Sequence, residues 1–280
     1  PNQFIETFTD DTNLGTETDG MKGTGYWGSI SSAGYTFTSD SNTSLLIHSN
    51  TSNGSTTFTD SSSGNHTITV RDGTTHSTTK SKFGNSSILI TESSGLTVPD
   101  HADFDFGTGA FTVECWINVT AVDLATATNT LYLFGKAGSV QTDFRLGIKT
   151  AGTAWTDEQV GNVNSAVNGT NNICDGNWHH LAVSRTSGGT KNMWVDGADN
   201  QSGGTNRNCD NSYVLGIGCQ GVNEVNGLIG YMDEYRISKG VARYTTSTFT
   251  PPAAEITTNA TGTLIQSANV VASNKTTVGG

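Results

Sequence analysis

The sequence predicts an all-β protein built from antiparallel sheets. The chain has 280 residues, of which 33% are hydrophobic and 14% are charged, and it contains 34 Gly but only 4 Pro. Such a composition is typical of many short strands joined by polar turns. No stretch shows a sustained apolar stripe of helical period with a capping signal at its start, whereas Thr and Val, which favour strands, are abundant. We therefore expect almost no helix.

A long antiparallel hairpin over residues 176–197 is the clearest single element. Leu181 and Val183 alternate with other residues on the first arm, and a Ser-Gly-Gly turn follows. Met193 and Val195 alternate on the return arm, which ends at an Asp-Gly turn. Alternation of period two on both arms of a glycine-containing turn predicts a β-hairpin whose four apolar side chains face the core.

Further strands are expected on both sides of this hairpin. Alternating runs begin at residues 44–48 and continue at residues 57–60 and 67–70, and a longer run covers residues 111–117. Phe111, Val113, Cys115 and Ile117 share one face of the last run and should belong to the core. The prolines at 251–252 should end the sheet, because proline has no N–H to extend a ladder.

Three ordered segments resemble laminin-G-like, concanavalin-A-like jelly rolls. The run W-H-H-L-A-V-S-R followed by W-V-D-G matches the central hairpin of that family, and residues 82–120 and 227–252 fall where the family has its flanking motifs. The resemblance implies a two-sheet antiparallel jelly-roll sandwich. Within the strand motifs, Trp116, Trp178 and Trp194 are expected in the core.

The chain is expected to have three parts. Residues 1–43 form a polar N-terminal arm or the end of a preceding β domain, because they are too poor in core residues to fold alone. Residues 44–252 form the jelly roll. Residues 253–280 form a linker and the first strands of a further β domain, which suggests a longer parent protein.

Two of the motifs resemble one subgroup of this family more closely than the others. The runs F-G-T-G-A-F-T-V-E-C-W and R-I-S-K-G-V-A-R-Y-T-x3-F-T-P-P are similar to the version found in bacteriophage virion proteins, such as tail fibres and capsid-surface appendages. This implies a non-enzymatic structural protein at the virion surface that attaches to host-surface glycans. The implied partners are other virion proteins, copies of the same chain in a homo-oligomer, and host-surface polysaccharide. The alternatives are a secreted cell-surface adhesin or extracellular filament subunit and, third, a glycan-active enzyme.

The charge of the chain argues against nucleic acid as a partner. The formal net charge is −11, and the 14 Lys and Arg are scattered instead of forming a stripe, so phosphate backbones are repelled. Membrane insertion is not expected either, since the longest apolar runs fall far short of the roughly 20 residues that span a bilayer.

Two acidic pairs are candidates for sugar cleavage, because glycosidases need two carboxylates across a cleft. Asp103 and Asp105 alternate correctly, but we expect this pair to be structural and to flank the core residues Phe104 and Phe106 in a turn. Asp233 and Glu234 are neighbours on a strand and are expected to point to opposite faces; by resemblance they belong to the closing strand of the family and are structural. We therefore expect no catalytic residues.

No metal site is expected from the sequence. His179 and His180 are adjacent on a strand and should face opposite ways, so they cannot share a metal. A bound calcium ion is the alternative, because many laminin-G-like modules hold one. Residues 90–96, however, lack the two aspartates that phage-type relatives usually carry before the V-P-D motif. We expect no cofactor and name no calcium ligands.

Sugar binding needs an exposed aromatic ring edged by amide and carboxylate groups. A loop over residues 150–159 and the loops after the hairpin offer these groups. The candidate ligand-binding residues are Trp155, Asp157, Tyr213, Gln220, Asn223 and Glu224. The alternative for Trp155 is that its ring only covers a sheet edge.

The four cysteines are too widely spaced for a zinc knuckle. Cys115 is expected to be a small buried apolar residue. Cys174 lies before the central hairpin and Cys209 after it, so a disulfide between them is one expectation, worth roughly 3.8 kcal/mol by loop entropy. Free thiols are the alternative, since virions assemble in a reducing cytoplasm.

Overall fold

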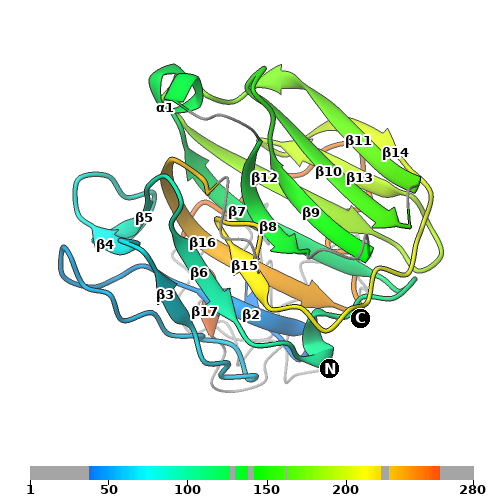
Figure 1. Cartoon of the computed structure of the whole chain (residues 1–280), viewed down its shortest axis with the longest axis horizontal. Coiled ribbons are helices and arrows are strands. Elements are labelled where there is room, and N and C mark those ends of the chain that lie inside the picture. Colours follow the sequence, from blue (N-terminus) through cyan, green and yellow to red (C-terminus); the bar gives the residue numbers. More distant parts are fainter. Residues whose placement is uncertain (1–37, 127–129, 138–141, 162, 222–226, 259–280) are drawn as a thin grey trace, which may run out of the picture. The chain divides into compact units, whose positions relative to one another are not determined.

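The computed structural model describes residues 38–126, 130–137, 142–161, 163–221 and 227–258 (Figure 1). All of these residues fall in one compact unit. The strands expected beyond residue 258 and the apolar clusters expected before residue 38 lie outside the described residues. Among the described residues, no helix is long and apolar enough to cross a membrane.

Seven strands form the first antiparallel sheet, in the spatial order β11-β10-β9-β8-β15-β6-β3. Their bounds are β3 Thr69–Arg71, β6 Gly95–Val98, β8 Leu131–Lys136, β9 Thr142–Ile148, β10 Thr153–Val160, β11 Val163–Asn172 and β15 Leu215–Ile217.

Eight strands form the second sheet, in the order β14-β13-β12-β7-β16-β5-β4, with β2 also paired to β16. Their bounds are β2 Thr43–Ile47, β4 Thr75–Ser77, β5 Ser87–Ile90, β7 Phe111–Asn118, β12 Trp178–Arg185, β13 Lys191–Val195, β14 Ala198–Gly203 and β16 Gly230–Lys239. Figure 1 shows β2 (blue) beside β16 (orange), although they are far apart in the sequence.

The short elements in the described part of the chain are a parallel pair, β1 Thr38–Ser39 with β17 Thr257–Thr258, a 3-10 turn η1 at Ala102–Phe104 and the short helix α1 at Ala121–Thr126. The expectation of an all-β sandwich with almost no helix is therefore confirmed for the described residues. The pair β1 and β17 lies outside the expected jelly-roll limits of residues 44–252.

The core lies between the two sheets, because apolar residues alternate on the strands of both. In the central hairpin, Leu181 pairs with Val195 and Val183 with Met193, and all four are buried. Opposite them, Phe144 and Leu146 on β9 extend the same core from the first sheet. The predicted hairpin and its core face are therefore confirmed.

The outer face of the second sheet is covered by the chain after β16. Trp194 packs there with Tyr244 and Phe249, whose rings stack with their centroids 3.7 Å apart. The Nε1 of Trp194 donates to Thr246 O at 3.0 Å. Trp116 is also buried, whereas Trp178 is only half-buried, so its placement in the core was wrong. Tyr244 of this cover contacts Glu114 on β7, whereas Lys82 and Phe83 lie against Trp116, and every residue of β7 is buried.

A β-bulge in β16 corrects one expectation about strand geometry. The pairing with β7 shifts between Asp233 and Arg236, and Glu234 has a φ of 49°. Met232 and Tyr235 both reach the core, so the two acidic residues between them lie on the other side together. Asp233 and Glu234 therefore do not point to opposite faces.

The strand expected at residues 57–60 is not formed. The side chain of Asp60 instead accepts hydrogen bonds from the main-chain N–H groups of Leu46, Ser62 and His66 at 2.8–3.0 Å. A buried carboxylate that binds three N–H groups of its own neighbourhood replaces the ladder bonds that a strand would need. Conversely, the loop expected at residues 150–159 is largely the regular strand β10.

Candidate functional site

Trp155 and Asp157 lie on the outward face of β10. Trp155 is 7% exposed and its ring packs against Tyr132 at a centroid distance of 6.1 Å. Asp157 is 2% exposed; its Oδ2 accepts from Arg145 Nη2 at 2.6 Å and its Oδ1 from Ser165 N at 3.0 Å. The guanidinium of Arg145 also lies 5.7 Å from the Trp155 ring. Trp155 thus covers the sheet, as the alternative interpretation expects, and the polar groups beside it bond to one another.

The other expected sugar contacts lie elsewhere. Tyr213 and Gln220 are half-buried and flank β15, which is three strand steps from β10, or about 14 Å. The structure therefore does not bring them next to Trp155. Asn223 and Glu224 lie outside the described residues, so their role stays a prediction.

The disulfide considered between Cys174 and Cys209 is not formed. All four cysteines are free and buried. Cys174 Sγ lies 4.0 Å from Gly152 O and Cys209 Sγ lies 3.6 Å from Gln159 O. These two carbonyls flank opposite ends of β10, about 23 Å apart along an extended strand, so the thiols cannot meet.

A closed ionic group lies between the sheets. Glu158 accepts from Arg185 Nη1 at 2.5 Å, and Lys191 Nζ lies 3.2 Å from its second oxygen. Arg185 also donates to the carbonyls of Gly107 and Gly109, which fixes the loop before β7. A small pocket beside this group is lined by residues that include Phe104, Phe106, Lys136, Phe144 and Asp210. Glu158 thus bonds to both cations, and the remaining donors of Arg185 bond to main-chain carbonyls, so this group ties β10 to β12, β13 and the loop before β7.

A second closed network lies under the chain that covers the outer face. Glu114 on β7 binds Arg236 on β16, and its Oε2 accepts from Tyr244 OH at 2.5 Å. His180 Nε2 lies 3.2 Å from the same oxygen. Burial alone would raise the pKa of Glu114, but Arg236, His180 and Tyr244 hold it well below its usual range.

The acidic residues considered for sugar cleavage have separate partners. Asp105 accepts a hydrogen bond from Lys136. Asp233 accepts from the main-chain N–H groups of Lys82 and Phe83 at 2.9 and 3.2 Å. Glu234 binds His48 Nδ1 at 2.6 Å and Ile256 N at 2.7 Å. Each of these carboxylates therefore fixes a loop or strand in place.

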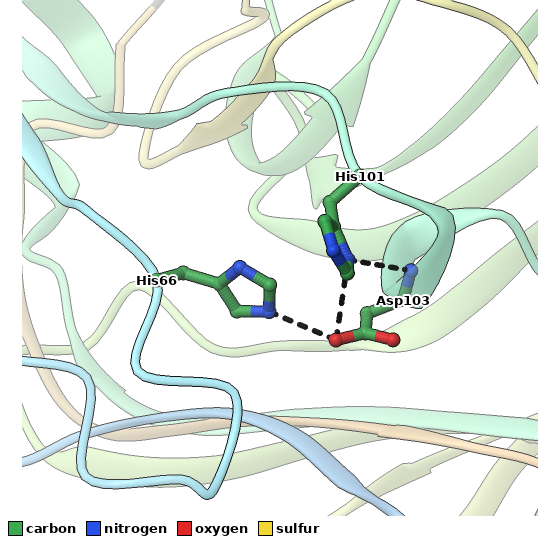
Figure 2. A group of neighbouring side chains, drawn as sticks. All are labelled: His66, His101 and Asp103. Carbon is green, nitrogen blue, oxygen red and sulfur yellow. Dashed lines mark hydrogen bonds and ion pairs between the residues drawn. The ribbon is translucent and has the colours of Figure 1, made fainter.

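Asp103 belongs to a cluster that sequence reasoning missed. Its Oδ2 lies 3.0 Å from His66 Nε2 and 3.2 Å from His101 Nδ1 (Figure 2). His66 comes from the segment before β3, and the other two come from the turn between β6 and β7. The H-A-D spacing was visible in the sequence, but nothing local links it to a histidine 35 residues earlier.

The two facing antiparallel sheets define a jelly-roll sandwich with loops at its rim. Residues 91–243, more than half of the chain, match the family model Laminin_G_3, described as the concanavalin A-like lectin/glucanases superfamily. The chain belongs to this superfamily, and its resemblance to laminin-G-like, concanavalin-A-like jelly rolls is confirmed. No curated protein sequence matches the chain.

Several solved structures share the fold. The binding domain of Paraclostridial Mosquitocidal Protein 1 has a TM-score of 0.56 at 16% identity, covering 71% of this chain and 49% of its own. The binding domain of botulinum neurotoxin DC in complex with SialylT has a TM-score of 0.52 at 10% identity, covering 72% and 49%. The same domain in complex with rat synaptotagmin II has a TM-score of 0.52 at 10% identity, covering 71% and 49%. The chain spans about half the length of these structures, and the similarity shows the fold alone.

Proposed function

We propose that the chain is a non-enzymatic attachment module on a virion surface that binds host-surface glycans. The observation that carries the proposal is the sandwich itself: similar solved structures are binding domains, and one of them was solved with SialylT. The same domain was also solved in complex with rat synaptotagmin II, so a protein ligand is the nearest alternative to a sugar.

The phage-type resemblance is supported by where its motifs lie. The run from Phe106 to Trp116 ends in β7, and the run that begins at Arg236 starts in β16, its direct neighbour in the sheet. Glu114 of the first motif and Arg236 of the second are bonded to each other. The two motifs therefore belong to one packed unit of the sandwich, which is consistent with treating them as a single signature.

Attachment by this module requires many copies. One shallow sugar site typically has a dissociation constant between about 1 mM and 1 μM, or about −4 to −8 kcal/mol. Linked copies that engage together gain roughly 10²- to 10⁴-fold in avidity. We therefore include other virion proteins and further copies of this chain among its partners, and the net charge of −11 suits an outward position.

The binding part of the proposal is tested on an array of bacterial glycans with the full chain. Tyr213→Ala and Gln220→Ala should each weaken the retained glycan signal. Both are candidate sugar contacts, and their side chains are half-buried beside β15, so part of each is accessible to a ligand. Gln201→Ala, on an exposed position of β14, is the matched control and should change nothing. Failure of the full chain to bind any glycan or host cell would contradict the proposal.

The location and the absence of catalysis need separate measurements. Mass spectrometry of purified particles should find the chain in many copies; finding it only in culture supernatant of a cellular organism would favour the adhesin alternative. Because the superfamily includes glucanases, the same glycans should be incubated with the chain and remain uncut. Hydrolysis that is lost in Asp105→Asn or Glu234→Gln would favour an enzyme.

A further inference from the structure

Three side chains of metal-ligand type converge where the segment before β3 meets the turn between β6 and β7. Figure 2 shows the imidazoles of His66 and His101 on two sides of the Asp103 carboxylate. Their three ligand atoms all lie within 4.8 Å of one another, and the two histidine rings have centroids 4.7 Å apart. Among the described residues this is the group with three such atoms in reach of one ion.

The spacing fits a small tetrahedral cation. Ligand atoms at about 2.0–2.1 Å from zinc lie about 3.3 Å from one another. The separations from Asp103 Oδ2 to His66 Nε2 and to His101 Nδ1 are 3.0 and 3.2 Å, close to that edge. Only the distance between the two imidazole nitrogens remains to be adjusted, by rotation of the exposed His101 side chain.

Both halves of the cluster are anchored independently of any ion. The main-chain N–H of His66 donates to Asp60, whose buried carboxylate also accepts hydrogen bonds from the main-chain N–H groups of Leu46 and Ser62. On the other side, η1 is closed by hydrogen bonds from Phe104 N to His101 O and from Asp105 N to Ala102 O. The buried Phe104 ring packs 4.8 Å from His66. The backbone positions of the ligands are therefore preorganised, which lowers the cost of binding.

The ligand set selects the class of ion. Calcium and magnesium prefer oxygen ligands, whereas two imidazoles and one carboxylate suit zinc and its late first-row neighbours. Three protein ligands leave a fourth position for water. The side chains of His101 and Asp103 are 53% and 39% exposed, so solvent can reach that position. We propose that His66, His101 and Asp103 bind one divalent transition-metal ion, with zinc as the preferred ion.

The competing explanation is that the three groups only bond to one another. His101 Nδ1 also accepts a hydrogen bond from Asp103 N at 3.2 Å, and an ion would displace that bond. Because the turn is exposed, water can take over the freed N–H, so the displacement costs little. Metal binding by the folded chain separates the two explanations.

The test uses the full chain without a histidine tag, dialysed against Zn²⁺ and counted by elemental analysis. One zinc ion per chain is expected. His66→Ala, His101→Ala and Asp103→Asn should each weaken binding by more than the about 10- to 100-fold that loss of an outer partner costs. His179→Ala is the matched control: His179 also binds two carboxylates, Asp175 and Asp196, but through opposite ring nitrogens, so it cannot direct them at one ion.

A second measurement guards against variants that fail to fold and against binding by thiols. Co²⁺ added to the wild-type chain should give the visible bands of a four-coordinate nitrogen and oxygen site, without a thiolate charge-transfer band. Excess Ca²⁺ should not displace it. Absence of bound Zn²⁺ and Co²⁺, a thiolate band, or equal affinity in the His101→Ala variant and the control would overturn the proposal.

Discussion

Glu114 and Arg236 form a fully enclosed ion pair between neighbouring strands. Arg236 Nη2 lies 2.5 Å and Nε 2.7 Å from Glu114 Oε1, and each side chain is 1% exposed. The second carboxylate oxygen binds Tyr244, which belongs to the segment that covers the sheet. One carboxylate therefore links β7, β16 and their cover.

We expect Glu114→Ala to lower the free energy of unfolding by about 3–5 kcal/mol, because it leaves the Arg236 charge buried without its partner. Chemical denaturation followed by tryptophan fluorescence measures this. The control is Asp40→Asn, which breaks the more exposed ion pair of Asp40 with Arg243 and should cost no more than about 1 kcal/mol. Equal losses in the two variants would contradict the importance of the enclosed pair.

A second prediction concerns pH. Burial raises the pKa of Asp233 to about 7, although hydrogen bonds from the main chain of Phe83 and Lys82 act in the opposite direction. In the unfolded chain the pKa of this carboxyl is about 3.9. Between these values the folded state holds a proton that the unfolded state has lost, so stability falls as pH rises, by at most about 1.4 kcal/mol per pH unit.

Asp233→Asn should remove this contribution, because the amide keeps an acceptor oxygen and cannot ionise. The difference between the wild-type and variant stability curves, measured by urea unfolding from pH 4 to pH 8, should therefore change with pH. Gln201→Ala, at an exposed position of β14 and without an ionisable group, is the control and should give a constant difference. A constant difference for Asp233→Asn as well would show that its pKa is not raised.

A third prediction uses the turn between β13 and β14. Gly197 has a φ of +76°, and a Cβ there would lie 2.0 Å from Phe249 O, in the segment that covers the outer face. Gly188 has a φ of +70° but nothing within 4 Å. Gly188→Ala should thus cost only the about 1–2 kcal/mol of the left-handed backbone. Gly197→Ala should lower the free energy of unfolding clearly more, as measured by thermal or urea unfolding. Similar losses in the two variants would mean that the segment around Phe249 moves away from the new Cβ at little cost.

These features also show what the sequence can predict. The alternation of Leu181, Val183, Met193 and Val195 fixes the hairpin register, because a slip of one residue would turn all four to the wrong side. The run at residues 57–60 alternates equally well, yet Asp60 captures nearby N–H groups and prevents a strand. Local pattern does not reveal which of two local hydrogen-bond arrangements has the lower free energy.

The candidate site was less predictable than the fold. The sequence predicts a loop at Trp155 and Asp157, but in the structure both lie on a strand, and their partners Tyr132, Arg145 and Ser165 come from three other strands. His66 and Asp103 likewise meet only through tertiary packing. Contacts between segments far apart in the sequence depend on sheet order, which a single sequence does not provide.

The last prediction concerns the thiols. Burial raises the pKa of Cys174 to about 11 and that of Cys209 to about 12. Because the thiolate is the reactive form, both should react slowly with a thiol reagent at pH 8 in the native chain and rapidly once it is unfolded. Cys115 and Cys219 are fully buried and should behave alike. Mass spectrometry of the alkylated chain, with and without denaturant, counts the thiols that react. Four alkylated thiols are expected after denaturation, because Cys174 and Cys209 contact carbonyls near opposite ends of β10 and cannot form a disulfide. If Cys174 and Cys209 instead stay unmodified and linked to each other, the chain contains the disulfide.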